Sequence, residues 1–173
     1  GFYGEIVVYE TSSFLDEPLA TKKTKKKRTK ALAFSPDGSI IASTSTAGRI
    51  QLWYFPKDNC DSVSCELELL PVSLSHGGSW VFPIAFAPYS TSDEIEIVSG
   101  SDGGMIKVWT IDVTDPPSVV SSLPVPSGAV YSLDWWSPPP GDTPEDSISM
   151  IVAGGDGDIT VYVYDGASME ILY

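Results

Sequence analysis

Short runs of apolar residues, separated by Gly, Pro, Asp and Ser, are the main pattern of this 173-residue chain. Residues 97–109 show it most clearly, because two runs rich in Ile, Val and Trp flank the turn residues Asp102, Gly103 and Gly104. β-Branched and aromatic residues favour strands, and small turn residues between two such runs favour a hairpin because they reach positive φ angles. This segment is therefore predicted to be a β-hairpin.

The second strand of this hairpin occurs in four imperfect copies. Each copy begins with glycine and has an aromatic residue five positions later; the aromatic residues are Tyr9, Trp53, Trp109 and Tyr162. They are 44, 56 and 53 residues apart. A period of this size is typical of a unit of four strands with connecting loops.

The intervening segments complete these units. Upstream of the last three copies, a strand-like run ends at a Pro-marked turn, at residues 31–38, 84–88 and 132–138. We expect three full four-stranded antiparallel units in an all-β fold, preceded by two strands of another at residues 5–10 and roughly 13–19. The expected single propeller-like segment 1–173 divides into residues 1–21, 22–75, 76–127 and 128–173.

Residues 32–38, Leu-Ala-Phe-Ser-Pro-Asp-Gly, and residues 48–53, Gly-Arg-Ile-Gln-Leu-Trp, resemble the WD-repeat β-propeller family. The resemblance implies blades of four antiparallel strands and a non-catalytic scaffold that holds proteins together in a larger complex. The Trp-Asp pair that names the family is degenerate here, since Tyr54, Thr110 and Val163 stand in place of the acid and only Tyr9-Glu10 keeps one.

About three and a half blades are expected to leave the ring incomplete, because closed propellers typically have four to eight. Either further blades come from the same gene product, or another chain completes the structure. A second copy of this chain would complete it, since two halves of three and a half blades make seven.

In this family, a His, a Ser or Thr, an Asp and the Trp of one blade commonly form a buried hydrogen-bonded tetrad. The second full blade offers His76, Ser99 and Trp109, but Gly103 stands where the Asp would be. We therefore interpret the sole histidine as structural and not as a catalytic base. The structural blade residues that the resemblance implies are Tyr9, Trp53, His76, Ser99, Trp109, Asp156 and Tyr162.

The formal charge of the chain is −13, and it is unevenly distributed. Seven of the ten basic residues lie between positions 22 and 30: Lys22, Lys23, Lys25, Lys26, Lys27, Arg28 and Lys30. The other 164 residues contain three basic and 23 acidic residues and so carry −20. Such an acidic body repels nucleic acid and membranes, so any contact with a polyanion is expected at this basic run.

The basic run, expected to be a loop, has three interpretations that the sequence leaves open. It could be a nuclear localisation signal, a contact for an acidic protein or RNA phosphates, or a loop whose charges only aid solubility. No aromatic residue lies within it, so base stacking is unsupported. The alternative function is thus a ribonucleoprotein or chromatin-associated subunit, and an intracellular location, nuclear or cytoplasmic, is expected, with the run favouring the nucleus.

No catalytic residue, metal site or cofactor is predicted. The Gly-rich segments lack the Lys of a phosphate-binding loop and the Glu of a calcium-binding loop. Cys60 and Cys65 could form a local disulfide, but two free thiols are favoured, and one distant histidine does not complete a zinc site. No apolar run is long enough to span a membrane.

Two further segments carry expectations. Trp80, Phe82, Tyr131, Trp135 and Trp136 fall on predicted inner strands, and most of these rings are expected in the core. Trp135 and Trp136 are adjacent, so they must face opposite sides of their strand. The Pro-rich segment 138–146 is expected to be an exposed loop.

Overall fold

The computed structural model describes residues 4–10, 18–24, 28–57, 60, 65–89, 93–114, 118–126, 128–138, 148–156 and 158–172. Within these residues the chain forms fifteen β-strands and no α-helix, so the predicted all-β class is confirmed. The Pro-rich segment expected to be a loop falls almost entirely outside the described residues.

The strands form four antiparallel sheets that follow the chain in order. The first pairs β1 (Gly4–Val8) with β2 (Ala20–Thr24). The second contains β3 (Thr29–Phe34), β4 (Ile40–Ser45), β5 (Arg49–Tyr54), β6 (Glu68–Leu69) and β7 (Leu74–Ser75). The third contains β8 (Val81–Phe86), β9 (Glu94–Ser101), β10 (Met105–Asp112) and β11 (Ser118–Pro126). The fourth contains β12 (Val130–Trp136), β13 (Ser149–Gly155), β14 (Ile159–Tyr164) and β15 (Met169–Ile171).

Each sheet is a meander of neighbouring strands, as the repeats predict. The hairpin predicted at residues 97–109 is formed by β9 and β10, and Gly104 in its turn has a φ of 77°. In the second sheet the outer strand is divided, because β6 pairs with one end of β5 and β7 with the other. The four-stranded antiparallel units of an incomplete propeller are therefore observed.

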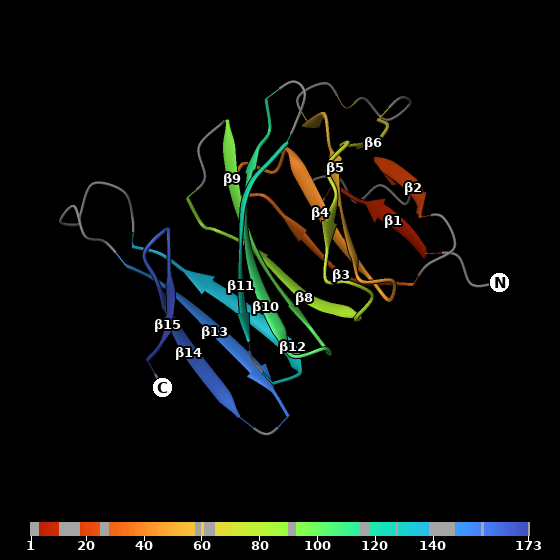
Figure 1. The fold of residues 1–173 in the computed structure, drawn as a ribbon. Coiled ribbons are helices and arrows are strands. Elements are labelled where there is room, and N and C mark those ends of the chain that lie inside the picture. The colour runs from red at the N-terminus through yellow and green to blue at the C-terminus, as the bar shows by residue number, and fades with distance from the viewer. Residues whose placement is uncertain are drawn as a thin grey trace.

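The sheets lie one after another, from β1 and β2 near the N-terminus to β12–β15 near the C-terminus (Figure 1). Apolar clusters fill each space between successive sheets. Ile97 packs toward the second sheet, whereas its neighbour Val98 packs toward the fourth. A strand buried on both faces reads as a continuous apolar run, which explains the Ile-Val sequence here.

Two sequence expectations about the first sheet are wrong. The strand that pairs with β1 is Ala20–Thr24, whereas residues 13–17 of the expected strand lie outside the described residues, so the expected boundary at residue 22 falls inside β2. Tyr9 lies beyond the end of β1 and is 59% exposed, so it is not a buried blade anchor. Ile6 and Val8 provide the buried contacts of this strand instead.

Candidate functional site

The sole histidine lies in a buried hydrogen-bonded cluster between the second and third sheets. His76 Nε2 is 2.8 Å from Ser99 Oγ, and Trp109 Nε1 donates to the same Oγ at 2.8 Å. An indole N–H can only donate, so Ser99 Oγ accepts from Trp109, and the tautomer of the imidazole sets whether Ser99 donates to His76 Nε2 or accepts from it. Because β9 and β10 are paired, Ser99 and Trp109 lie close enough for this contact. The structure thus brings together three of the predicted residues.

The fourth tetrad member is missing, and a buried nitrogen lacks a partner as a result. Among the described residues, His76 Nδ1 is the buried side-chain nitrogen or oxygen with no hydrogen-bond partner. Gly103 provides no side chain there, and a Cβ atom at this position would collide with the side chain of Ser79. The nearby Asp102 carboxylate instead accepts the backbone N–H of Trp80 at 2.7 Å.

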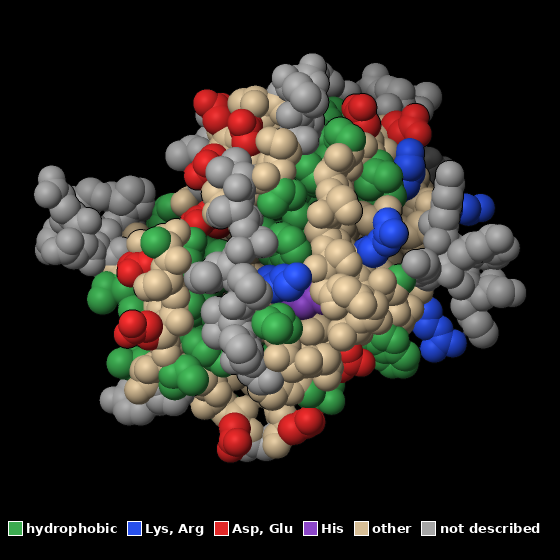
Figure 2. Space-filling model, viewed as in Figure 1, with side chains coloured by type: hydrophobic (Ala, Val, Ile, Leu, Met, Phe, Trp, Pro, Cys, Tyr) green, Lys and Arg blue, Asp and Glu red, His purple; other side chains and the backbone are tan. Residues whose placement is uncertain are grey.

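This environment keeps the imidazole neutral. Burial, together with a smaller effect of the positive charge of Lys107, lowers the pKa of His76 to about 4. Lys107 Nζ donates to Ser75 O and lies 5.0 Å from the centre of the Trp109 ring. Figure 2 shows that only a small part of the histidine, in purple, reaches the surface. A neutral histidine whose neighbouring serine, Ser99, is fully buried and already bound by Trp109 is suited to a structural role.

The second sheet repeats part of this cluster without the histidine. Trp53 Nε1 donates to Ser43 Oγ at 2.9 Å, as Trp109 does to Ser99. Ser43 Oγ in turn donates to the backbone oxygen of Gln51 at 3.4 Å. Trp53 and Ser43 are both buried. The aromatic–hydroxyl contact is therefore a repeated feature of the blades.

Thr24, the last residue of β2 in the first sheet, occupies the position equivalent to that of His76. The backbone N–H of His76 donates to Gly48 O at the start of β5. Thr24 pairs with Gly4 at the start of β1, the strand that corresponds to β5 in the repeat. Like His76, Thr24 is buried. Its hydroxyl lies 3.5 Å from that of Thr29. A shorter side chain at this position leaves space beside Ser43.

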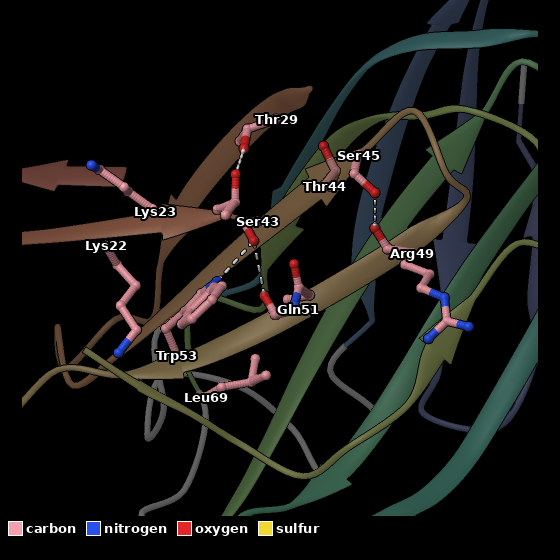
Figure 3. Close-up of a pocket in the computed structure, with 11 residues that line it drawn as sticks. Lys22, Lys23, Thr29, Ser43, Thr44, Ser45, Arg49, Gln51, Trp53 and Leu69 are labelled. Carbon is pink, nitrogen blue, oxygen red and sulfur yellow. Dashed lines mark hydrogen bonds between the residues drawn. The ribbon is translucent and has the colours of Figure 1, made fainter. Parts of the chain in front are cut away.

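A pocket of about 520 Å³ occupies this space. Figure 3 shows Ser43, Gln51 and Trp53 in the middle of the group, with Lys23 and Arg49 extending away from it on opposite sides. Most hydroxyl groups of the lining bind the protein's own backbone or side chains. Most of the lining residues are of polar or charged type, although their carbon atoms also contribute to the surface. They are Lys22, Lys23, Thr24, Thr29, Ser43, Thr44, Ser45, Arg49 and Gln51, beside Trp53 and Leu69.

Replacing Thr24 with histidine is expected to fill part of this pocket. The introduced imidazole should hydrogen-bond to Ser43 as His76 does to Ser99, and it should raise the free energy of unfolding at pH 7.5 by about 1 kcal/mol. Urea denaturation measures the stability, and NMR titration measures the pKa of the new ring. A pKa near the ordinary value of about 6.5, with no gain in stability, would contradict this equivalence.

The fourth sheet lacks both the histidine and the hydroxyl. Tyr162 is buried and pairs with Ile151 as Trp109 pairs with Ile97, but Ala153 occupies the position of Ser99. A pocket of about 140 Å³ opens here, lined by Gly128, Ala153 and Asp156 among others. Asp156 itself is exposed. It therefore does not join a buried tetrad.

The basic run is not the continuous loop that the sequence indicates. Lys22 and Lys23 lie in β2 and Lys30 lies in β3, while Lys25, Lys26 and Lys27 fall outside the described residues. Lys22 forms an ion pair with Glu66 at 2.7 Å. Lys30 Nζ lies over two aromatic rings, 5.3 Å from the Trp80 ring centre and 5.2 Å from that of Phe82. Lys22 and Lys30 thus have intramolecular partners.

The cysteine interpretation is wrong. Cys60 and Cys65 form a disulfide in the structure, and both pack against the apolar cluster between the first two sheets. The sequence spacing left this pairing open, and the fold brings the two residues together.

The described part of the chain lacks two kinds of feature. It contains no group of three His, Cys, Asp or Glu residues arranged to hold a metal ion. It also contains no helix with the length and apolar character needed to cross a membrane.

Most of the aromatic residues expected in the core are exposed. Trp135 is 5% exposed and Trp136 is 52% exposed, so the prediction that they face opposite sides is confirmed. Trp80 and Tyr131, however, are about half exposed. Composition alone could not separate them from core residues, because an aromatic residue on a strand can face either the interior or the solvent. The sequence signal that could have indicated their exposure is their position at the start of the inner strands.

Comparison with protein families matches residues 17–54 to the WD40 model, described as WD domain, G-beta repeat. The matched segment ends at the last residue of β5 and includes Trp53. The resemblance to this family, inferred from residues 32–38 and 48–53, is therefore confirmed for that segment. No curated protein matches the chain in sequence.

Proposed function

Because the chain carries a WD40 repeat, and WD40 repeats generally mediate protein–protein interactions without catalysis, we propose that it is a scaffold subunit of a larger complex. In this proposal the stacked sheets hold exposed strands and loops in fixed positions for partner proteins. A further protein segment, from the same gene product, from another chain or from a second copy, packs on the end of the row of sheets.

One uncovered sheet face carries this proposal. The fourth sheet packs one face against the third through residues such as Ile151 and Tyr162. On the opposite face, the cross-strand register groups apolar side chains that are 39% to 73% exposed, namely Trp136, Val152, Ile159 and Leu172. An apolar sheet face of this kind favours association with another protein surface. Another blade-like sheet would match it in shape and chemistry.

The double variant Val152→Lys and Ile159→Lys tests this face. We expect the unmodified chain to self-associate as its concentration rises, and the variant to remain monomeric because two charges would be buried on association. Sedimentation velocity measures both. Tyr89→Lys is the matched control, since Tyr89 is exposed on the connection after β8 and outside the fourth sheet. A compact, stable monomer at all concentrations would count against the proposal.

The ribonucleoprotein or chromatin alternative depends on the basic run and has less support. Lys22 is already paired with Glu66, and Lys30 is already placed over aromatic rings. A nuclear location stays a prediction on the same grounds. If neutralising Lys22, Lys23 and Lys30 leaves RNA affinity and its salt dependence unchanged, the RNA alternative fails.

A further inference from the structure

Three aromatic side chains form a continuous group on the inner strands of the third and fourth sheets. Trp80 precedes β8, Phe82 lies within it, and Tyr131 lies in β12. The ring centres of Trp80 and Phe82 are 6.1 Å apart, and those of Phe82 and Tyr131 are 5.4 Å apart, both in edge-to-face geometry. Trp80 is 47% exposed and Tyr131 is 52% exposed. These rings therefore present π surface that the fold does not cover.

A cation already occupies this aromatic surface. β8 lies between β3 and β12 (Figure 1), so Lys30 of β3 reaches the group from one side. Its Nζ is within 5.3 Å of both the Trp80 and Phe82 ring centres, a distance at which an ammonium group is attracted to a ring face. Lys30 is itself exposed, so a competing cation from solution can reach the same rings.

Carboxylates border the same group. Asp102 is held beside Trp80 by the 2.7 Å hydrogen bond from the Trp80 N–H to its Oδ1. The pKa of the Tyr131 hydroxyl is raised first by the negative charge of Asp156, with burial, a hydrogen bond to Asp156 and the charge of Asp102 contributing less. The two aspartates follow β9 and β13 in the chain. Negative charge at the edge of an aromatic surface attracts cations and repels phosphates.

We propose that Trp80, Phe82 and Tyr131, bordered by Asp102 and Asp156, form a docking site for a lysine or arginine side chain on an extended basic segment of a partner protein. Lys30 is the intramolecular occupant that this partner displaces. The acidic charge of the remaining chain, −20 over 164 residues, would steer a basic segment toward the site. The inference deepens the proposed scaffold function, on which it rests, by naming the chemistry of a partner.

A capped heptapeptide, Gly-Ser-Lys-Gly-Lys-Ser-Gly, serves as the probe, and its Gln-for-Lys counterpart is the matched control peptide. Isothermal titration calorimetry of the folded 173-residue chain at low salt is expected to show binding of the lysine peptide only. Lys30→Gln should raise its affinity about three- to tenfold, because removing an internal competitor increases the fraction of open sites. Trp80→Leu and Tyr131→Leu should each lower it at least about threefold, because a leucine has no π face.

Two charge controls make the test specific. Lys23→Gln removes the same charge as Lys30→Gln, but from β2, which belongs to the first sheet and pairs with β1. It should change affinity less than about twofold. Asp156→Asn should weaken binding about two- to fivefold with no loss of fold, since Asp156 is exposed.

The proposal is overturned if the lysine and glutamine peptides bind equally, if Lys23→Gln and Lys30→Gln have the same effect, or if neither leucine variant weakens binding. Circular dichroism and urea denaturation establish that each variant is folded before titration. Failure here with self-association intact would remove the basic-segment site and leave the scaffold proposal standing. If the chain does not self-associate but still binds the lysine peptide, the uncovered sheet face loses its support and the basic-segment site stands.

Discussion

Ser99→Ala is expected to lower the free energy of unfolding by about 2 to 4 kcal/mol. The serine hydroxyl serves both Trp109 Nε1 and His76 Nε2, and all three side chains are buried. Alanine would leave two polar atoms without a partner in addition to the unpaired His76 Nδ1. Each unpaired buried group costs about 1 to 3 kcal/mol. Urea denaturation monitored by tryptophan fluorescence measures the loss.

Ser43→Ala is the matched control for this substitution. It removes the same hydroxyl from the second sheet, where the hydroxyl accepts from Trp53 Nε1 and makes a long 3.4 Å contact with the Gln51 backbone oxygen in place of a histidine. The pocket of about 520 Å³ beside it can admit water to replace the lost hydrogen bond, so a loss of about 1 kcal/mol is expected. The double variant Trp109→Phe and Ser99→Ala should lose less unfolding free energy than the two single variants lose together. Equal losses for Ser99→Ala and Ser43→Ala would contradict the shared-hydroxyl geometry.

Stability is expected to fall between pH 7 and pH 5 because of His76. Its pKa is about 4 in the folded chain and about 6.5 when unfolded. The unfolded state therefore binds more protons in this window, and stability rises with pH. The stability that neutral His76 contributes is present above its unfolded pKa of about 6.5 and is lost as the pH falls toward 4. At pH 5 the loss should be about 2 kcal/mol relative to pH 7.

His76→Gln isolates this effect, since it retains a group that can hydrogen-bond to Ser99 but does not titrate. The comparison is the difference in unfolding free energy between pH 7 and pH 5 for the two proteins. Glu96 acts in the opposite sense, because burial raises its pKa and stability from this group falls as the pH rises. Both proteins share Glu96, so its effect cancels in the difference. If the unfolding free energy changes between pH 7 and pH 5 by the same amount in His76→Gln as in the unmodified protein, His76 is not kept neutral.

The fold could be predicted from local pattern to a large extent. The Gly-to-aromatic repeat and the Pro-marked turns indicate strands close to β5, β10 and β14, and the hairpin at residues 97–109 is formed. The prediction was wrong where local signals were weak. β2 contains Thr and Lys residues with little apolar character, so its position depends on pairing with β1. The Cys60–Cys65 disulfide likewise depends on how the chain folds back between the first two sheets.

The sequence by itself determined the all-β class, the repeated four-stranded unit, and the residue types of the His76, Ser99 and Trp109 cluster. These follow from local propensity and from spacing along the chain. Only the tertiary structure decided which polar atoms lack partners and which aromatic rings stay uncovered. The unpaired His76 Nδ1, the pocket beside Thr24, and Lys30 over Trp80 and Phe82 all arise between different sheets. Contacts between strands far apart in the chain set them, and no local pattern encodes such contacts.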